Sequence, residues 1–389
     1  MTKVPRRARR QARRAPGRLP HAAAMVACVI FCACTRVADT APRKRSAGPS
    51  STTETSSETG EFGRAESPAD PTDIAPPSPL PNFASVAHEV APSVVTVIST
   101  LPRRGSRHPS HGIGSGLLVS AAGQILTNEH VVAGATKIHV ELANLERVEA
   151  KLIYGAPKLD LALLQLVAPT RGPQRTLRPA RFRDRAATPG EWVMAVGQPF
   201  GLGDTVTVGV VSGVGRDHAD LGRPKRLDPD GIWSFIQTDA SVNIGNSGGP
   251  LVDTEGRVLG LTTAVRRDGQ GLAFAIPSAM AVKFLAEVRA HGRFRFTRLG
   301  ISAHNVGPEQ FPSRLSTVQV TKIDPNGPGS LAGVKRGDVI VTIDGQAIRR
   351  VAEVAYLTQL RGVNESVRFE LLDDEGTKRT VLVVPDAAR

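Results

Sequence analysis

The stretch "GNSGGPLVDTEGRVLGLTT" (residues 245–263) decides between two folds, because its serine, Ser247, fits more than one kind of turn. The G-x-S-x-G pattern occurs in the nucleophile elbow of α/β-hydrolases, where a helix follows the serine at once and the acid and histidine come later. Here the residues after Ser247 read as a β-hairpin instead. This context excludes the hydrolase elbow and predicts β-structure on both sides of Ser247.

Short β-branched runs, separated by Gly, Asn, Asp and Pro, continue on both sides of this hairpin. They lie at residues 93–100, 114–120, 137–142, 161–166, 191–197, 205–215, 235–238, 256–265 and 272–277. Strands of this length and spacing predict an all-β sandwich or barrel. Two helices are predicted to flank them, at 83–90 and 277–292. The second has an apolar stripe and ends at Gly292, as expected for a glycine C-cap.

Charge is distributed unevenly along the 389 residues, a length that predicts two or three domains. The formal net charge is +13, but residues 1–36 hold nine Lys or Arg and no acidic residue. The remainder has 40 basic and 36 acidic residues. The basicity therefore belongs mostly to a leader and does not indicate a nucleic-acid partner.

The leader, residues 1–36, has a basic front and a short apolar run at 22–34. That run is shorter than the roughly 20 residues needed to span a bilayer, so an export signal is predicted. "FCAC" (31–34) also resembles a lipobox, which makes Cys34 a candidate for lipidation. An ordinary signal peptide, a short uncleaved anchor and a mitochondrial transit peptide remain alternatives. We expect a bacterial periplasmic or envelope protein, with or without a lipid anchor.

The rest of the chain is predicted to hold a linker and two domains. Residues 37–81 are rich in Ser, Thr, Pro and Glu and poor in apolar residues, so they are expected to form a disordered linker. Residues 82–292 form the first domain, and residues 297–386 form a small β-rich domain with a helix at 352–361. All three cysteines lie in the leader, so no disulfide is expected in the folded domains.

A serine needs a base that accepts its proton, and that base needs an orienting partner. "ILTNEHVVAGA" (125–135) places His130 after an apolar strand, and "KLDLALLQL" (158–166) places Asp160 at the start of another. The order His, Asp, Ser is that of the chymotrypsin-type triad. His130, Asp160 and Ser247 are therefore predicted to be the catalytic base, the orienting acid and the nucleophile.

Five stretches resemble the HtrA/DegP/DegS family of serine proteases. They are "TNEHVV" (127–132), "DLALLQL" (160–166), "GQPFGLGDTVTVGVVSGVGR" (197–216), "FIQTDASVNIGNSGGPLVD" (235–253) and "GLAFAIPS" (271–278). The resemblance covers residues 82–290, and "PNGPGSLAGVKRGDVIVTIDGQAI" (325–348) extends it to the PDZ domain of that family. It implies an all-β-dominated, chymotrypsin-like protease domain of two six-stranded barrels, a single PDZ domain, and a homotrimer formed through a segment starting near Phe83.

The same resemblance implies further site residues. The backbone amides of Gly245 and Ser247 are expected to form the oxyanion hole. Asn246 stands where digestive enzymes have Asp, so zymogen-type activation is not expected. Ser241 stands where trypsin has an acid for basic side chains, and the nearby Val242 and Ile244 are apolar, so cleavage after small or medium aliphatic residues is predicted. Leu272 and Ala273 complete the predicted substrate pocket. The chain departs from the family at Gln198, where Asn is commoner.

The resemblance also indicates how activity is controlled. Leu299, Gly300 and Ile301 are expected to form the PDZ loop that binds a peptide carboxylate, and residues 213–234 occupy the place of a regulatory loop. The segment 101–113 is short, which predicts a simple trimer and no larger cage.

Together, these features predict an ATP-independent endopeptidase for misfolded or unfolded proteins. No phosphate-binding loop and no metal-spaced cluster occurs in the sequence, so neither cofactor nor metal is expected. The alternative is a PDZ scaffold or holdase chaperone with an inactive or latent protease domain.

Overall fold

The computed structural model describes residues 81–102, 110–167, 177–198, 205–224, 226–243, 245–265, 271–307 and 317–388. The predicted leader with Cys34, the linker through residue 80, and Ile244 lie outside these ranges. None of the helices within them is long and apolar enough to cross a membrane.

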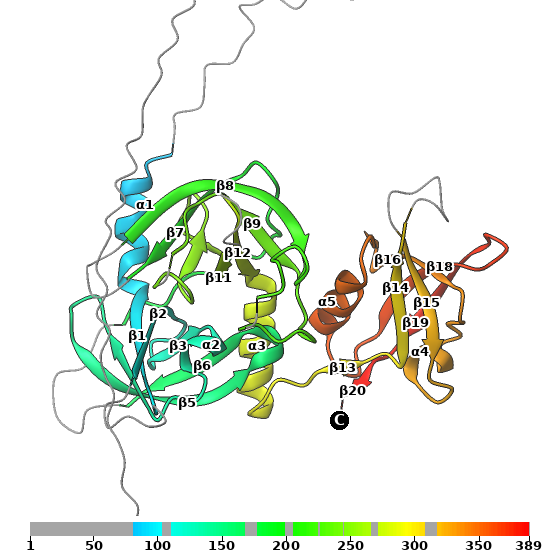
Figure 1. The fold of residues 1–389 in the computed structure, drawn as a ribbon, viewed down its shortest axis with the longest axis horizontal. Helices are drawn as coiled ribbons and strands as arrows, with labels where there is room; N and C mark the ends of the chain where they lie inside the picture. Colours follow the sequence, from blue (N-terminus) through cyan, green and yellow to red (C-terminus); the bar gives the residue numbers. More distant parts are fainter. Residues whose placement is uncertain are drawn as a thin grey trace, which may run out of the picture. The chain divides into compact units, whose positions relative to one another are not determined.

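The strands before residue 167 form the first barrel. In the described residues it closes antiparallel in the order β1-β2-β3-β6-β5-β4 (Figure 1). Its strands are β1 (Val94–Leu101), β2 (Ser110–Leu118), β3 (Gln124–Thr127), β4 (Lys137–Glu141), β5 (Arg147–Ala156) and β6 (Leu161–Leu166). Because β3 and β6 are antiparallel neighbours, the residues that follow β3 lie beside those that precede β6.

The second barrel follows with the same number of strands, in the order β10-β11-β12-β9-β8-β7 over the described residues. Its strands are β7 (Trp192–Gly197), β8 (Thr205–Arg216), β9 (Phe235–Thr238), β10 (Pro250–Val252), β11 (Val258–Val265) and β12 (Ala273–Pro277). β10 and β11 form the hairpin predicted after Ser247, with Leu251 opposite Gly260. The predicted all-β fold is confirmed.

Short helical elements connect and cover the barrels. They are α1 (Phe83–Val90), η2 (Ala91–Ser93), α2 (Glu129–Val132), η3 (Pro157–Leu159) and α3 (Ser278–His291). α3 contacts strands of both barrels, namely β6 of the first and β11 and β12 of the second. It ends at Gly292, whose φ of +68° and N–H bond to Val288 make the predicted C-cap.

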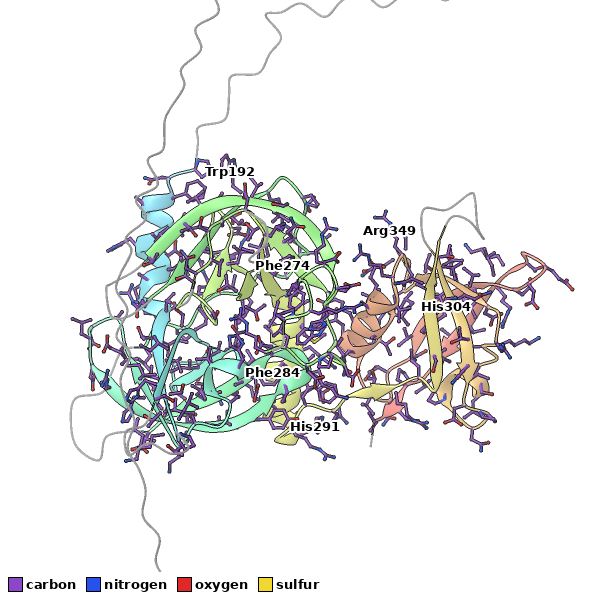
Figure 2. The ribbon with its side chains drawn as sticks, in the orientation of Figure 1. Trp192, Phe274, Phe284, His291, His304 and Arg349 are labelled. Carbon is purple, nitrogen blue, oxygen red and sulfur yellow. The ribbon has the colours of Figure 1, made fainter. Side chains whose placement is uncertain are left out.

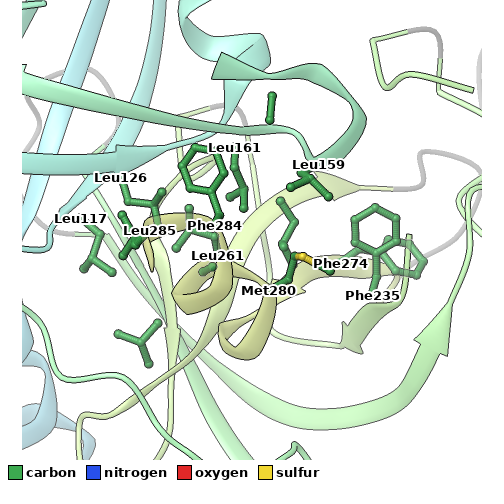
Figure 3. Close-up of a cluster of buried hydrophobic side chains, with 14 of the residues drawn as sticks. Leu117, Leu126, Leu159, Leu161, Phe235, Leu261, Phe274, Met280, Phe284 and Leu285 are labelled. Atoms are coloured by element: carbon green, nitrogen blue, oxygen red, sulfur yellow. The ribbon is translucent and has the colours of Figure 1, made fainter. Parts of the chain in front are cut away.

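The largest core cluster contains apolar side chains from both barrels and from α3. Phe284 of α3 and Phe274 of β12 are almost fully buried (Figure 2). Met280 and Leu285 lie on the same helix, and Figure 3 shows them with side chains of both barrels. Because apolar burial is the main favourable term in folding, this shared core fixes the two barrels against each other. That contact sets the geometry of any site at their junction.

The described residues after 296 contain a two-stranded sheet, in which β13 pairs with β20, and a six-stranded sheet. The six-stranded sheet has the order β14-β15-β16-β18-β19, with β17 paired to β16. The elements are β13 (Thr297–Arg298), β14 (Ile301–Val306), β15 (Thr317–Ile323), α4 (Pro328–Leu331), β16 (Val339–Ile343), β17 (Gln346–Ala347), α5 (Val351–Arg361), β18 (Val367–Leu372), β19 (Lys378–Val383) and β20 (Asp386–Ala387). β14 therefore lies at one edge of the described six-stranded sheet.

A buried arginine ties the entry of β7 to the β10–β11 hairpin. The side chain of Arg183 is 1% exposed; it pairs with Glu191 at 2.8 Å and lies 3.8 Å from a carboxylate oxygen of Asp253. Arg183→Ala leaves the buried Asp253 and the half-buried Glu191 with one cation fewer, so the free energy of unfolding should fall by about 3 kcal/mol. Urea unfolding measures this change. Arg185→Ala is the matched control, because Arg185 pairs with the same Glu191 but is 61% exposed. We expect a loss of less than about 1 kcal/mol for it, and equal losses would contradict the prediction.

Candidate active site

The first barrel brings two of the predicted catalytic side chains together. His130 lies in α2, just after β3, and Asp160 lies between η3 and β6. Antiparallel pairing of β3 with β6 places these two turns side by side. The Nδ1 atom of His130 is 2.8 Å from Oδ1 and 2.9 Å from Oδ2 of Asp160. When the Nδ1–H group donates a hydrogen bond to the carboxylate, Nε2 is the ring nitrogen that can accept a proton.

The Asp160 carboxylate is 2% exposed and is held by several donors. Its Oδ1 also accepts the backbone N–H of His130 at 3.0 Å, and its Oδ2 accepts the hydroxyl of Thr263. The side-chain amide of Asn128 donates to the Asp160 carbonyl at 3.0 Å. These contacts hold a residue whose backbone is left-handed, with φ of +51°. The carboxylate is therefore fixed against the imidazole by both its backbone and its side chain.

Thr263 of β11 links this pair to Ser247. While the Thr263 side chain donates to Asp160, its carbonyl accepts the Ser247 hydroxyl at 3.3 Å. His130, Asp160 and Ser247 thus converge where the barrels meet. Among the described residues, the Ser247 hydroxyl bonds to Thr263 and not to His130. A hydrogen bond from Ser247 to His130 would require the hydroxyl to rotate away from the Thr263 carbonyl.

Two glycines shape the turn around Ser247. Gly245 has φ of +109° and Gly248 has φ of +87°, in the region that favours glycine. A Cβ on Gly248 would lie 2.2 Å from the Ser115 carbonyl oxygen and 2.5 Å from Oγ1 of Thr127. Both the backbone angle and the close packing therefore require glycine at 248.

The residues predicted for the substrate pocket lie in different environments. Ser241 is exposed and Leu272 is half-buried, whereas Val242 and Ala273 are buried in the core of the second barrel. Ile244 is outside the described residues. Ser241 and Leu272 are therefore the predicted pocket residues whose described surface can meet a substrate.

The predicted peptide-binding loop borders a groove beside the six-stranded sheet that contains β14. Leu299, Gly300 and Ile301 border a cavity of about 520 Å³ that also involves Val354 and Thr358 of α5. The edge strand β14 runs along this groove. An edge strand beside a groove is the arrangement in which an extended peptide adds to a sheet.

Residues 114–261 match the trypsin-like peptidase domain, and residues 319–373 match the PDZ domain. The serine protease named HhoA from Synechocystis is 34% identical over 291 residues, which cover 71% of this chain and 71% of HhoA. A solved structure of the HtrA-type protease AlgW with a tripeptide is 28% identical and covers 79% of this chain and 98% of that chain, with a TM-score of 0.61. The chain belongs to the HtrA family of serine proteases. The resemblance stated from its motifs is confirmed.

Some HtrA-family relatives are longer than the region shared with this chain. A DegP-like periplasmic serine endoprotease from Marinomonas is 35% identical over 294 residues, covering 74% of this chain but 59% of that relative. Because the chain spans about three fifths of such a relative, its own activity and partners are inferred below from its residues.

In this HtrA-family chain, the predicted regulatory segment 213–234 contacts the start of α5. Arg350 pairs with Asp220 and lies 3.4 Å from a carboxylate oxygen of Asp217. At this contact its acidic residues are the ones that bond, and the cation comes from the PDZ side.

Thr263 is a site residue that the sequence analysis did not single out. It lies 16 residues after Ser247 and has no distinctive motif around it. The available signal in the sequence was the pair Thr262–Thr263 in an otherwise apolar strand. In the structure both residues are 0% exposed. Buried hydroxyls need hydrogen-bond partners, so such a pair indicates polar contacts across the barrel.

We expect Glu129, next to His130, to make the stability of the fold depend on pH. Burial, and then the charge of Asp160, raise the pKa of the Glu129 carboxyl, while His130 acts in the opposite direction. A raised pKa means that this group favours the fold below its ordinary pKa and loses that contribution as pH rises through its folded value. Glu129→Gln should therefore raise the melting temperature at pH 7, by about 1–2 °C because the group is half-exposed.

Thermal unfolding at pH 7 and pH 4 measures this effect, and the gain should vanish at pH 4. Glu149→Gln, at an exposed position of β5, is the control and should change little at either pH. A gain for Glu129→Gln that is the same at both pH values would contradict the assignment.

Proposed function

We propose that this chain is an ATP-independent serine endopeptidase of the cell envelope that cleaves unfolded or misfolded proteins through an acyl-enzyme. Ser247 is the nucleophile, His130 the general base and acid, and Asp160 the residue that orients His130. The PDZ domain binds peptide C-termini and controls the protease domain.

In this mechanism, Ser247 Oγ attacks the scissile carbonyl carbon while its proton passes to Nε2 of His130. Asp160 holds the imidazole in the required tautomer and stabilises the imidazolium. The amides of Gly245 and Ser247 donate to the oxyanion. The C–N bond then breaks as His130 gives the proton to the leaving amine, and water, activated by His130, releases the acyl group from Ser247.

The hydrogen bonds that converge on Thr263 are the observation that supports this proposal most strongly. One residue of the second barrel holds the Asp160 carboxylate through its hydroxyl and the Ser247 hydroxyl through its carbonyl. A serine, a histidine and a carboxylate in a shared network have the parts needed for acyl transfer. A binding module alone has no need for this arrangement.

Degradation of an unfolded protein tests the function. The full chain should digest casein with no ATP and no added metal. Stably folded proteins should be digested more slowly than casein. Binding and protection of casein with no cleavage, at any pH from 5 to 9 and with a PDZ-binding peptide added, would instead establish the scaffold or holdase alternative.

Control by the PDZ domain is supported by the peptide groove and by the bonds of Arg350 to segment 213–234. Arg350 precedes α5, and α5 borders the groove through Val354 and Thr358. A peptide that enters between β14 and α5 thus meets the helix whose first turn is tied to the protease domain. In AlgW the solved complex holds a tripeptide, which agrees with peptide recognition in the family.

A homotrimer is part of the proposal, and we place its interface at α1 and at the strands β7 and β8. Phe83 of α1 packs edge-to-face on Trp192, with ring centres 5.9 Å apart. Trp192 is still 44% exposed, and Val208 on the neighbouring strand β8 is 40% exposed. Exposed apolar side chains of this kind are typical of protein interfaces.

Native mass measurement should give a single species of three chains at micromolar concentration. Trp192→Asp should convert that species to monomer. A stable hexamer or larger cage would contradict the simple trimer.

An exported location is supported by the leader and by the periplasmic name of the Marinomonas relative. We place the working domains in the bacterial periplasm or envelope, with Cys34 as the candidate lipid anchor. Mass spectrometry of the mature N-terminus distinguishes lipidated Cys34 from cleavage at another site.

A further inference from the structure

Ser115 of β2 is fully buried and bonds the first barrel to the turn that carries Ser247. Its N–H donates to the Ser247 carbonyl at 2.7 Å, and its hydroxyl donates to the Gly245 carbonyl at 2.7 Å. The hydroxyl also accepts the N–H of Gln198 at 3.1 Å. Because its single proton goes to Gly245 and a lone pair is taken by Gln198, the hydroxyl has one fixed orientation.

These bonds hold both residues whose amides are proposed to form the oxyanion hole. A peptide unit is planar, so anchoring the carbonyls of Gly245 and Ser247 fixes the peptide planes 245–246 and 247–248. These two planes lie on either side of the peptide that carries the Ser247 amide, and the first of them adjoins Gly245. Gly245 has no side chain to restrict its own rotation, and its φ of +109° is one of many that glycine can adopt. The Ser115 hydroxyl supplies the restriction that the residue itself lacks.

The anchor is rigid because β2 is held on both sides. β2 pairs with β1 and β3, and the Thr127 hydroxyl donates to the Ser115 carbonyl at 2.7 Å. A Cβ on Gly249 would lie 3.2 Å from the Cβ of Ser115, so the turn packs closely on this side chain. A side chain on a rigid barrel strand positions a neighbouring turn more precisely than a side chain on a loop does.

We propose that Ser115 is a positioning residue for the oxyanion hole: its hydroxyl holds the Gly245 carbonyl, so that the turn carrying the Gly245 and Ser247 amides keeps the conformation in which they face the developing oxyanion. The inference rests on the proposed peptidase function. It predicts a loss that is confined to the transition state, because substrate binding does not use the Ser115 hydroxyl.

Steady-state hydrolysis of a peptide substrate by Ser115→Ala, in the full chain, tests the proposal. We expect kcat to fall about 10- to 100-fold with KM within twofold, since losing an oxyanion donor outright costs about 10²–10³ in kcat. The rate of Ser247 modification by a fluorophosphonate should fall by a similar factor. Ser115→Cys keeps a weak donor and should lose less activity than Ser115→Ala.

Ser93→Ala is the matched control. Ser93 is also buried, and its hydroxyl also donates to a backbone carbonyl, that of Arg178, at 2.8 Å, away from the nucleophile turn. Ser93→Ala should keep kcat within twofold although it loses a comparable bond. Thermal unfolding gives the folded fraction of every variant, and rates are compared where all are folded.

Equal losses of kcat in Ser115→Ala and Ser93→Ala would overturn the inference, as would a Ser115→Ala enzyme within twofold of wild type. A raised KM with unchanged kcat would overturn it as well. An inactive wild-type chain would be a different failure, because it would reject the proposed peptidase itself before any variant is compared.

Discussion

Ser247→Ala should lower kcat for peptide hydrolysis by about 10⁵- to 10⁶-fold, the largest effect expected of any single substitution in this chain. The alanine has no oxygen to form the acyl-enzyme, and neither His130 nor Asp160 can replace it. Binding should survive, so KM or the dissociation constant for an unfolded protein should change by less than about threefold. Residual hydrolysis above the uncatalysed rate should come from the oxyanion hole and binding alone.

Stopped assays of peptide cleavage over hours measure the residual rate, with Ser93→Ala as the matched serine-to-alanine control. The control should retain activity within about twofold. A Ser247→Ala chain that keeps even one tenth of the wild-type kcat would contradict the assignment of the nucleophile.

Asp160→Asn should lower kcat by about 10⁴-fold, the second-largest effect. In the wild-type chain the Asp160 carboxylate accepts hydrogen bonds from Nδ1 of His130 and from the Thr263 hydroxyl. A carboxamide has only one accepting oxygen, and its NH₂ group favours the imidazole tautomer with the proton on Nε2. That tautomer cannot take the proton of Ser247.

The two substitutions should be strongly non-additive, because the side chains act as one unit. Asp160→Asn in a Ser247→Ala background should cost less than about threefold further. Asp374→Asn, at an exposed position, is the control and should leave kcat unchanged. Independent, additive losses would argue that Asp160 acts on folding and not on His130.

Much of this fold could be predicted because local signals and tertiary packing agree. The run at 161–166 is apolar except for Gln165 and is β6, and the helix predicted at 277–292 is α3, bounded by Pro277 and Gly292. The hairpin after Ser247 was the decisive local signal. The predicted PDZ helix at 352–361 differs from α5 by one residue at its start.

The elements that were missed have weak local signals. β5 alternates exposed Arg147 and Glu149 with buried Val148 and Ala150, so its apolar content is too low for a run of β-branched residues. Strands of this kind are stabilised by their neighbours in a closed barrel, which a local pattern does not contain.

The residues of the candidate site also differ in how far the sequence could indicate them. Order and context could indicate His130, Asp160 and Ser247, because each lies next to a strong strand signal. Thr263 and Ser115 could not be identified in this way, since their roles depend on contacts across the junction of the barrels. The pocket prediction had the same weakness, because whether Ala273 faces the cleft or the core depends on how β12 sits in its barrel.

Covalent labelling with a fluorophosphonate, followed by mass-spectrometric mapping of the modified residue, tests the central claim most directly. The account predicts one phosphonylated residue, Ser247, at close to one label per chain, with labelling abolished in Ser247→Ala and slowed at least 10³-fold in Asp160→Asn. Labelling at a different serine, or no labelling of folded wild-type chain at pH 8 with a PDZ-binding peptide present, would contradict it.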